Sequence, residues 1–151
     1  MGLSHIILLA ALSALLLAAV VTDWRSRTIG NWLNGAIAIG APLWWWTNGF
    51  PLWPDITVLV AQAAIAFAVF AVMFAIGAMG GGDVKMIAAL ALWFPPTQFF
   101  HLIMVMAIAG GVLTVAMMIW HKIHKAEGRP EIPYGIAIAF AALWEISQTI
   151  S

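Results

Sequence analysis

Two aspartates stand out in a chain that is otherwise mostly apolar, because each falls where a long apolar run ends. Asp23 follows the first run in "VVTDWRSRTIGNWLN", and Asp83 follows three glycines in "MGGGDVKM". Two carboxylates that lie close together cannot easily both ionise, so their titrations are coupled. One protonated and one ionised aspartate can activate a water between them for attack on a peptide carbonyl. The pair therefore suggests hydrolytic acid–base chemistry.

The glycines before the second aspartate suit such a site. Because glycine lacks a Cβ, Gly80 and Gly82 allow unusual backbone dihedrals and let a substrate backbone approach the acid closely. A structural alternative is a helix stop followed by an aspartate N-cap. For Asp23 the structural alternative is a helix-ending acid that pairs with Arg25 or Arg27. Both alternatives stay open when each motif is taken alone.

The other acids and the histidines suggest less chemistry. Three acids are interpreted as solvated loop residues: Asp55, Glu127 and Glu131. Glu145 lies near the end of the last apolar run, where it can either reach the interface or find a polar partner. His121 and His124 share a helical face, but with no third ligand nearby they are interpreted as an interfacial pair. We therefore predict no metal and no cofactor.

Composition indicates a membrane protein. The chain has 151 residues, of which 64% are hydrophobic and 8% are charged. A soluble domain carries about 25% charged residues. The formal net charge is zero and there is no basic patch, which argues against nucleic acid as a partner. Because cysteine is absent, disulfides and thiolate metal sites are excluded. We expect one transmembrane domain over residues 1–151, in contact with membrane lipid.

Polar clusters divide the chain into six predicted transmembrane helices, which give an all-α bundle: 5–22, 32–47, 57–78, 84–95, 97–120 and 135–150. A helix needs about 20 residues to cross about 30 Å of hydrocarbon. The first, third and fifth segments come close to that length, whereas the fourth is much shorter. We therefore expect Asp83 to lie below the cytoplasmic surface on irregular backbone, which is tolerated where it is buried in protein or lines a water-filled cavity.

Positive charge predicts the orientation. All the lysines and arginines fall in alternate connections between the predicted helices: Arg25, Arg27, Lys85, Lys122, Lys125 and Arg129. By the positive-inside rule these connections are cytoplasmic, so both termini face outward. Tryptophans at the predicted outer interface are Trp44, Trp45, Trp46 and Trp53, and those at the inner one are Trp24, Trp32 and Trp120. We interpret them all as interfacial anchors.

Two motifs resemble a known family. The tetrapeptide GGGD at 80–83 fits the G-x-G-D motif of intramembrane aspartic proteases, and DWRSRTIGN at 23–31 is similar to the D-x-R-x-x-x-I-P-N stretch of type IV prepilin peptidases. One departure is Gly30, where the family usually has proline. The similarity extends to Lys85, Pro133, Tyr134 and Gly135. The resemblance therefore covers essentially the whole chain.

The resemblance implies a peptidase of the bacterial inner membrane that removes the leader from prepilins or pseudopilins at the cytoplasmic face. The matching catalytic pair is Asp23 and Asp83, and Arg25 and Asn31 are interpreted as supports that orient the loop or bind headgroups. Larger family members also methylate the new N-terminus with a cysteine-bearing region. Because this chain has no cysteine, it looks more like the compact Flp/Tad-type peptidases, and we predict cleavage without methylation.

Two other classes of protein compete with this interpretation. Broken helices and intramembrane acids also mark small transporters and channels. Such transporters often repeat the interruption in two halves of the sequence, and no internal repeat is visible here. A non-catalytic assembly protein of a pilus system is a third possibility, against which the presence of both aspartates argues. The sequence does not indicate an oligomeric state.

Overall fold

The computed structural model describes residues 2–124 and 132–150, and within these ranges it contains helices and turns but no strand. The elements in chain order are α1 (Leu3–Ser26), α2 (Asn31–Asn48), η1 (Leu52–Ile56), α3 (Thr57–Ala75), α4 (Gly81–Leu90), α5 (Pro96–Ile123) and α6 (Tyr134–Ile150). The predicted all-α class is therefore confirmed. Four residues named above lie outside the described ranges: Lys125, Glu127, Arg129 and Glu131.

Three helical stretches are long and apolar enough to cross a membrane. They are Leu3–Ser26, Leu52–Ala75 and Pro96–Ile123, and they correspond to the first, third and fifth predicted spans. Helix α6 is a shorter apolar helix, and α2 has 18 residues. That all six segments cross the membrane and that both termini lie outside stay predictions.

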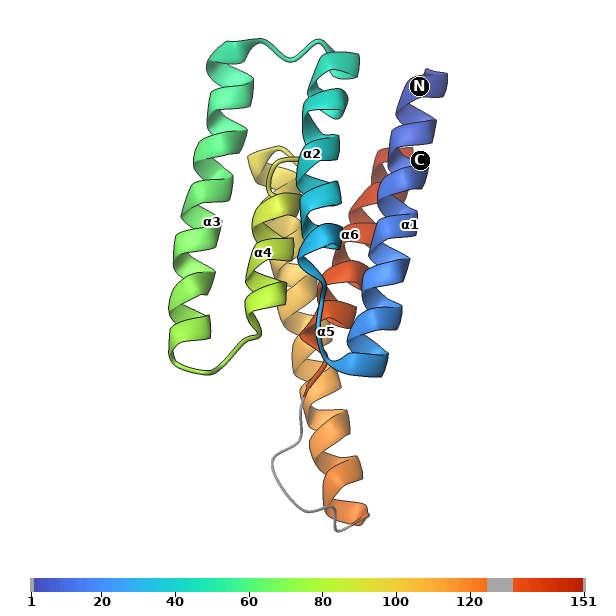
Figure 1. Ribbon diagram of the computed structural model, residues 1–151, viewed down its shortest axis with the longest axis vertical. Coiled ribbons are helices and arrows are strands. Elements are labelled where there is room, and N and C mark those ends of the chain that lie inside the picture. The colour runs from blue at the N-terminus through green and yellow to red at the C-terminus, as the bar shows by residue number, and fades with distance from the viewer. Residues whose placement is uncertain (1, 125–131, 151) are drawn as a thin grey trace.

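The helices form a bundle whose two ends can be told apart (Figure 1). Helix α1 packs against α2 and α6, α5 packs against α6, and α4 contacts α2, α3 and α6. The two termini lie at one end of the bundle. The end of α1 and the start of α4 lie toward the other end. Both aspartate motifs are therefore carried at the end opposite the termini.

The core forms mainly where α1, α2, α4 and α6 meet. Its fully buried large side chains include Leu12, Leu16, Leu33, Ile37, Ile87, Leu90 and Ile138. Large apolar side chains of α3 and α5 are instead exposed at many positions, among them Ile65, Val69, Phe100 and Val112. Such all-round apolar helices suit a lipid environment, where apolar outer faces carry no penalty. Helix α4, most of whose residues are buried, thus lies inside the bundle between α2, α3 and α6.

Helix α4 is short, as predicted, and irregular backbone lies on both sides of it, at 76–80 and at 91–95. Gly80 is the N-cap in an extended conformation, so Asp83 belongs to the first helical turn. The prediction that Asp83 lies on irregular backbone is therefore wrong. The helix has 10 residues and ends at Leu90, after which the chain turns through 91–94. At about 1.5 Å per residue, the helix rises only about 15 Å.

The turn that follows α4 is satisfied by side chains of neighbouring helices. Gln62 of α3 donates its Nε2 amide to the carbonyls of Ala91 and Phe94, each at 2.9 Å. Trp45 of α2 donates its indole N–H to the Leu92 carbonyl at 2.7 Å. Carbonyls at a helix end that have no partner are costly where water is excluded. These donors allow α4 to stop inside the bundle.

The interpretation of the tryptophans as interfacial anchors is wrong for two of them. Trp44 is buried and its ring packs against Trp93, with the ring centroids 5.9 Å apart. Trp45 is half-buried and serves the turn after α4. Trp46 and Trp53 are exposed, as anchors would be. The physical reason is that the turn after α4 lies inside the bundle. There Trp45 donates a hydrogen bond to the turn, and the Trp44 ring packs against Trp93 of the turn.

Candidate active site

Asp23 lies in the last turn of α1 and is buried, with 5% of its surface exposed. The helix ends at Arg27, which has a left-handed backbone (φ 54°) and donates its N–H to the Asp23 carbonyl at 3.0 Å. Asp23 forms no ion pair in direct contact with either Arg25 or Arg27 in the described ranges. The helix-ending ion pair considered as the structural alternative is therefore not formed.

The carboxylate of Asp23 lies against the start of α6. A Cβ on Gly135 would come within 2.8 Å of Asp23 Oδ2 and 2.7 Å of Ile29 Cδ1, so a larger residue would force a shift. The backbone N–H groups of Gly135 and Ile136, at the start of α6, face the Asp23 carboxylate, and a helix start is a favourable place for an acidic side chain. Even so, Asp23 Oδ2 is buried and has no hydrogen-bond partner in the described part of the chain.

Asp83 lies in the first turn of α4 and is also buried, with 7% of its surface exposed. It stands three residues after the N-cap, and the Gly80 N–H faces its carboxylate. This is the returning half of a capping box, in which an acid of the first turn reaches back to the N-cap amide. A Cβ on Gly80 would come within 2.9 Å of Asp83 Oδ2. The space beside Gly80 is thus filled by the carboxylate itself.

The glycines do not adopt the unusual dihedrals that the sequence suggested. Gly80 is extended (φ −73°, ψ 145°), and Gly81 and Gly82 are helical. The glycine of this region with positive φ is Gly77, at 74°. The glycines beside Asp83 therefore do not use the unusual dihedrals that glycine allows, and close contacts explain them instead.

Ile29, in the loop between α1 and α2, links the two aspartate motifs. A Cβ on Gly82 would lie 3.1 Å from both the Cβ and the carbonyl oxygen of Ile29. The side chain of Ile29 also reaches Gly135 of α6, as described above. The loop is thus packed between the start of α4 and the start of α6.

Two hydrogen bonds hold the start of α2 against the start of α4. Lys85 Nζ donates to Asn31 Oδ1 at 2.7 Å, and Asn34 Nδ2 donates to the Gly82 carbonyl at 3.0 Å. Asn31 therefore fixes the lysine ammonium at the start of α4. Asn34 is 5% exposed, and its Oδ1 has no partner among residues 2–124 and 132–150.

The remaining residues singled out from the sequence have different surroundings. Arg25 is exposed in the last turn of α1. Pro133 is buried just before α6, and its carbonyl accepts the Ile136 N–H at 3.2 Å. Tyr134 packs on α5, where a Cβ on Gly110 would lie 3.4 Å from its ring. Arg25 is thus peripheral to the carboxylates, whereas Pro133 and Tyr134 hold α6 in place.

Glu145 has found the polar partner that the sequence left open. It is 3% exposed and pairs with His101 Nδ1 across the α5–α6 contact. Both residues are carried toward the end of α6 that is remote from Gly135. The pair thus belongs to helix packing rather than to the carboxylate site.

Three residues beside the carboxylates were not assigned to the site from the sequence. Ile29 falls at the isoleucine of the D-x-R-x-x-x-I-P-N stretch, but an apolar loop residue by itself indicates no role. Asn34 could have been noticed, because it follows Asn31 by one turn on an otherwise apolar helix. Arg27 was considered only as an ion-pair partner.

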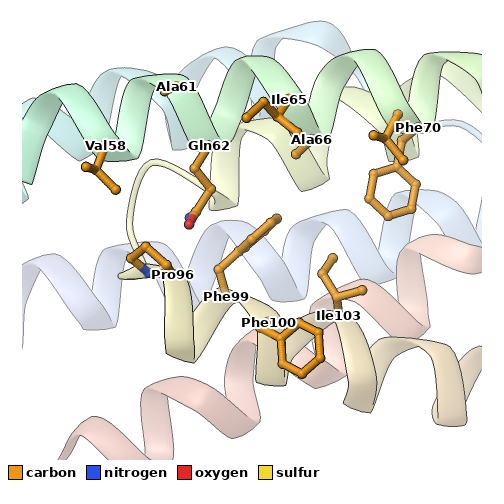
Figure 2. A pocket seen from close by; sticks show the side chains of 11 residues that line it. Val58, Ala61, Gln62, Ile65, Ala66, Phe70, Pro96, Phe99, Phe100 and Ile103 are labelled. Carbon is orange, nitrogen blue, oxygen red and sulfur yellow. The ribbon is translucent and has the colours of Figure 1, made fainter.

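A separate apolar groove lies on the outer side of the bundle, between α3 and α5 (Figure 2). It has a volume of about 560 Å³, and its lining includes neither aspartate. Gln62 points into it, but its amide is engaged by the turn after α4. The other lining residues are apolar, among them Ile65, Phe99 and Ile103. The groove therefore offers no chemistry of its own.

The fold and the site together define an apolar helical membrane protein with two buried carboxylates at one end of the bundle. In a comparison with models of protein families, residues 10–115 match the type IV leader peptidase family. This match covers more than half of the sequence, so the chain belongs to the type IV leader peptidase family. It includes both aspartates but ends before Pro133, Tyr134 and Gly135. No curated protein and no solved structure matches the chain.

Proposed function

We propose that this protein is an aspartic endopeptidase of the bacterial inner membrane that cleaves the leader peptide from type IV prepilins of the Flp type. The observation that carries the proposal is the burial of both aspartates, Asp23 at the end of α1 and Asp83 at the start of α4. Ile29, in the loop after α1, packs against Gly82 next to Asp83. Family membership supports peptidase activity. Two buried carboxylates at one end of the bundle are suited to activating a water between them.

In the proposed mechanism, Asp23 is the ionised member of the pair. Asp23 is given this role because the backbone N–H groups at the start of α6 face its carboxylate, and such groups at a helix start stabilise negative charge. Asp23 takes a proton from water as the water oxygen attacks the scissile carbonyl carbon. Protonated Asp83 donates to the carbonyl oxygen. When the C–N bond breaks, the proton held by Asp23 passes to the leaving amine, and the oxygen returns its proton to Asp83.

The substrate is proposed to reach this site from the cytoplasmic side. Arg25 and Lys122 lie in the last turns of α1 and α5, Arg27 caps α1, and Lys85 is bonded to Asn31 at the start of α2. The ends of α1 and α5 lie away from the two termini (Figure 1), which supports a cytoplasmic location for that end of the bundle. A prepilin joins a short basic leader to an apolar helix, so its cleavage point would lie at the membrane surface. The absence of cysteine supports cleavage without N-methylation.

The proposal is tested by co-expressing the chain with a candidate Flp-type prepilin and following leader loss on a gel. Asp23→Asn and Asp83→Asn are each expected to reduce processing about 100-fold or more, because each removes one proton carrier. Asp55→Asn is the matched control, since Asp55 is exposed in η1 and belongs to neither aspartate motif. It should process at the wild-type rate.

Membrane fractionation accompanies each variant, so that loss of processing is not confused with loss of insertion. Processing that survives Asp23→Asn or Asp83→Asn in the membrane fraction would contradict the two-aspartate mechanism. A wild-type chain that leaves every tested prepilin uncut, while Asp83→Asn abolishes an ion flux in vesicles, would favour a transporter or channel instead.

A further inference from the structure

The apolar groove between α3 and α5 arises because these two helices pack on different partners. Helix α3 packs mainly on α4, and α5 packs mainly on α6, which leaves about 560 Å³ open between them. Side chains of α3 line the groove turn after turn from Val58 to Phe70, and Phe99, Phe100 and Ile103 of α5 lie across the gap (Figure 2). At 1.5 Å per residue, the α3 side of the groove runs for about 18 Å.

The groove leads along α3 toward the helix start that carries Asp83. Phe74 follows Phe70 by one turn on the same face of α3. A Cβ on Gly81 would lie 3.3 Å from the Phe74 ring, so this ring packs on the first turn of α4. Gly80 is exposed, and a Cβ on it would meet Asp83 Oδ2 at 2.9 Å. One turn of α3 therefore separates the groove from the motif that carries Asp83.

The lining of the groove suits a helix rather than an extended chain. Its one polar side chain is Gln62, whose amide is already bonded to the carbonyls of Ala91 and Phe94. An extended chain in such a groove would leave its backbone N–H and C=O groups without partners, whereas a helix satisfies its own. A groove of about 18 Å accommodates about 12 residues of a helix, whose apolar side chains recur at i, i+3, i+4 and i+7.

We propose that the groove between α3 and α5 is the docking site for the apolar helix of the prepilin substrate, with the N-terminal end of that helix at the start of α4. This inference rests on the proposed function, in which the scissile bond precedes an apolar helix. The substrate chain then leaves the groove past Phe74 and reaches Asp83 over the exposed backbone at Gly80. The groove thereby selects substrates by their apolar helix, while the aspartates act on the segment before it.

Filling the groove with a larger side chain tests this proposal. Val69 and Val60 are both in α3 and are 55% and 49% exposed. Val69 lines the groove, whereas Val60 lies about two and a half turns away on the opposite face of the helix. With full-length prepilin in detergent, Val69→Trp is expected to raise KM about tenfold or more and to change kcat by less than about twofold, because docking does not touch the reacting atoms. Val60→Trp should behave as the wild type.

A short peptide that spans the cleavage site but lacks the apolar helix is the matched control substrate. The wild type, Val69→Trp and Val60→Trp should all cleave it with the same kinetic constants. The unfolding temperature of each variant is measured alongside.

Cross-linking provides a second measurement that does not depend on cleavage. Because the chain has no cysteine, Val69→Cys and Val60→Cys can each be combined with Asp83→Asn, which leaves the prepilin uncut. Single cysteines are placed along the apolar helix of the prepilin, and the membranes are mildly oxidised. A disulfide to the prepilin is expected from Val69→Cys and not from Val60→Cys.

The outcomes separate this inference from the proposed function. Absence of the cross-link at Val69→Cys, or an unchanged KM in Val69→Trp, overturns the docking site and would leave the groove to lipid chains. An equally raised KM for the short peptide also overturns it, because the effect would then not depend on the apolar helix. If the wild-type chain cleaves no prepilin, the proposed function fails, whereas cleavage that requires both aspartates but is unaffected by Val69→Trp overturns the inference alone.

Discussion

Two glycines give the two aspartates the space that their carboxylates occupy. A Cβ on Gly80 would lie 2.9 Å from Asp83 Oδ2, and a Cβ on Gly135 would lie 2.8 Å from Asp23 Oδ2. Contacts below 3 Å require something to move, and both carboxylates are held on buried helix turns. The two glycines therefore fix where the carboxylates can lie, although neither has a backbone conformation that only glycine adopts.

We predict that Gly135→Ala reduces prepilin cleavage about 10- to 100-fold. The new methyl group must displace Asp23 or Ile29 by a substantial fraction of an ångström, and a displacement of about 1 Å in a catalytic group costs about 100-fold. The initial rate of leader removal by purified protein is the measurement.

Gly111→Ala provides the matched control for this prediction. Gly111 lies inside α5, and an added Cβ there has nothing within 4 Å. Cleavage should be unchanged, and the helix should gain slightly in stability. Equal rates for the two alanine variants would show that space beside Asp23 is not limiting.

At the scale of the helices, α4 owes its position to polar contacts at both of its ends. Its start is held by Asn34, which donates to the Gly82 carbonyl, and by the bond from Lys85 to Asn31. Its end is held by Gln62 and Trp45, which donate to carbonyls of the turn at 91–94. A helix too short to cross the bilayer requires such donors, because its end carbonyls cannot reach water.

We predict that Gln62→Leu lowers the free energy of unfolding by about 1–3 kcal/mol, the usual cost of leaving buried carbonyls without a partner. The affected carbonyls are those of Ala91 and Phe94. Thermal unfolding in detergent is the measurement. Gln148→Leu, at an exposed position of α6, is the control and should leave the unfolding temperature nearly unchanged. A similar shift in both variants would argue against the role of Gln62.

We predict that Asn34→Leu impairs cleavage more than stability. Leucine removes the donor to the Gly82 carbonyl, but it also removes a buried Oδ1 that has no partner in the described ranges. The stability effects therefore partly offset each other, while the start of α4 loses a contact that holds Asp83 in place. Cleavage rate and unfolding temperature are measured together, with Asn48→Ala at the opposite end of α2 as the control. A variant with wild-type cleavage would exclude a positioning role.

At the scale of the whole molecule, the two ends of the bundle differ in charge. The four described lysines and arginines are carried by the end that holds both aspartates, and the two termini lie at the other end. Helix α5 has 28 residues, which is more than the about 20 needed to cross the hydrocarbon. Its basic last turn can therefore extend beyond the membrane core, as charged side chains there require.

We predict that the aspartate end faces the cytoplasm. Because the chain contains no cysteine, single cysteines can be introduced without a background signal. Asp55→Cys should react with a membrane-impermeant maleimide in intact cells with a permeable outer membrane, and Ser26→Cys should react only after the inner membrane is opened. Both positions are exposed. The reverse pattern would invert the orientation.

The sequence by itself determined the class of fold and the residues on which the proposed chemistry depends. Its apolar content and the spacing of its polar clusters predicted a helical membrane bundle with a short fourth helix, because lipid requires each segment to satisfy its own backbone. The motifs around Asp23 and Asp83 predicted the family that the comparison with known families confirmed. Helix ends were less well predicted, and α4 begins three residues before the expected start of 84.

Only the tertiary structure decided what surrounds each aspartate. Contacts between residues distant in the chain place Gly135 against Asp23, Ile29 against Gly82 and Asn34 under the start of α4. No local pattern encodes such contacts, because they depend on how three helix ends meet. For the same reason Trp44 and Trp45 proved to be buried or engaged in the turn after α4. The sequence thus identified the two aspartates, whereas packing determined which groups surround and position them.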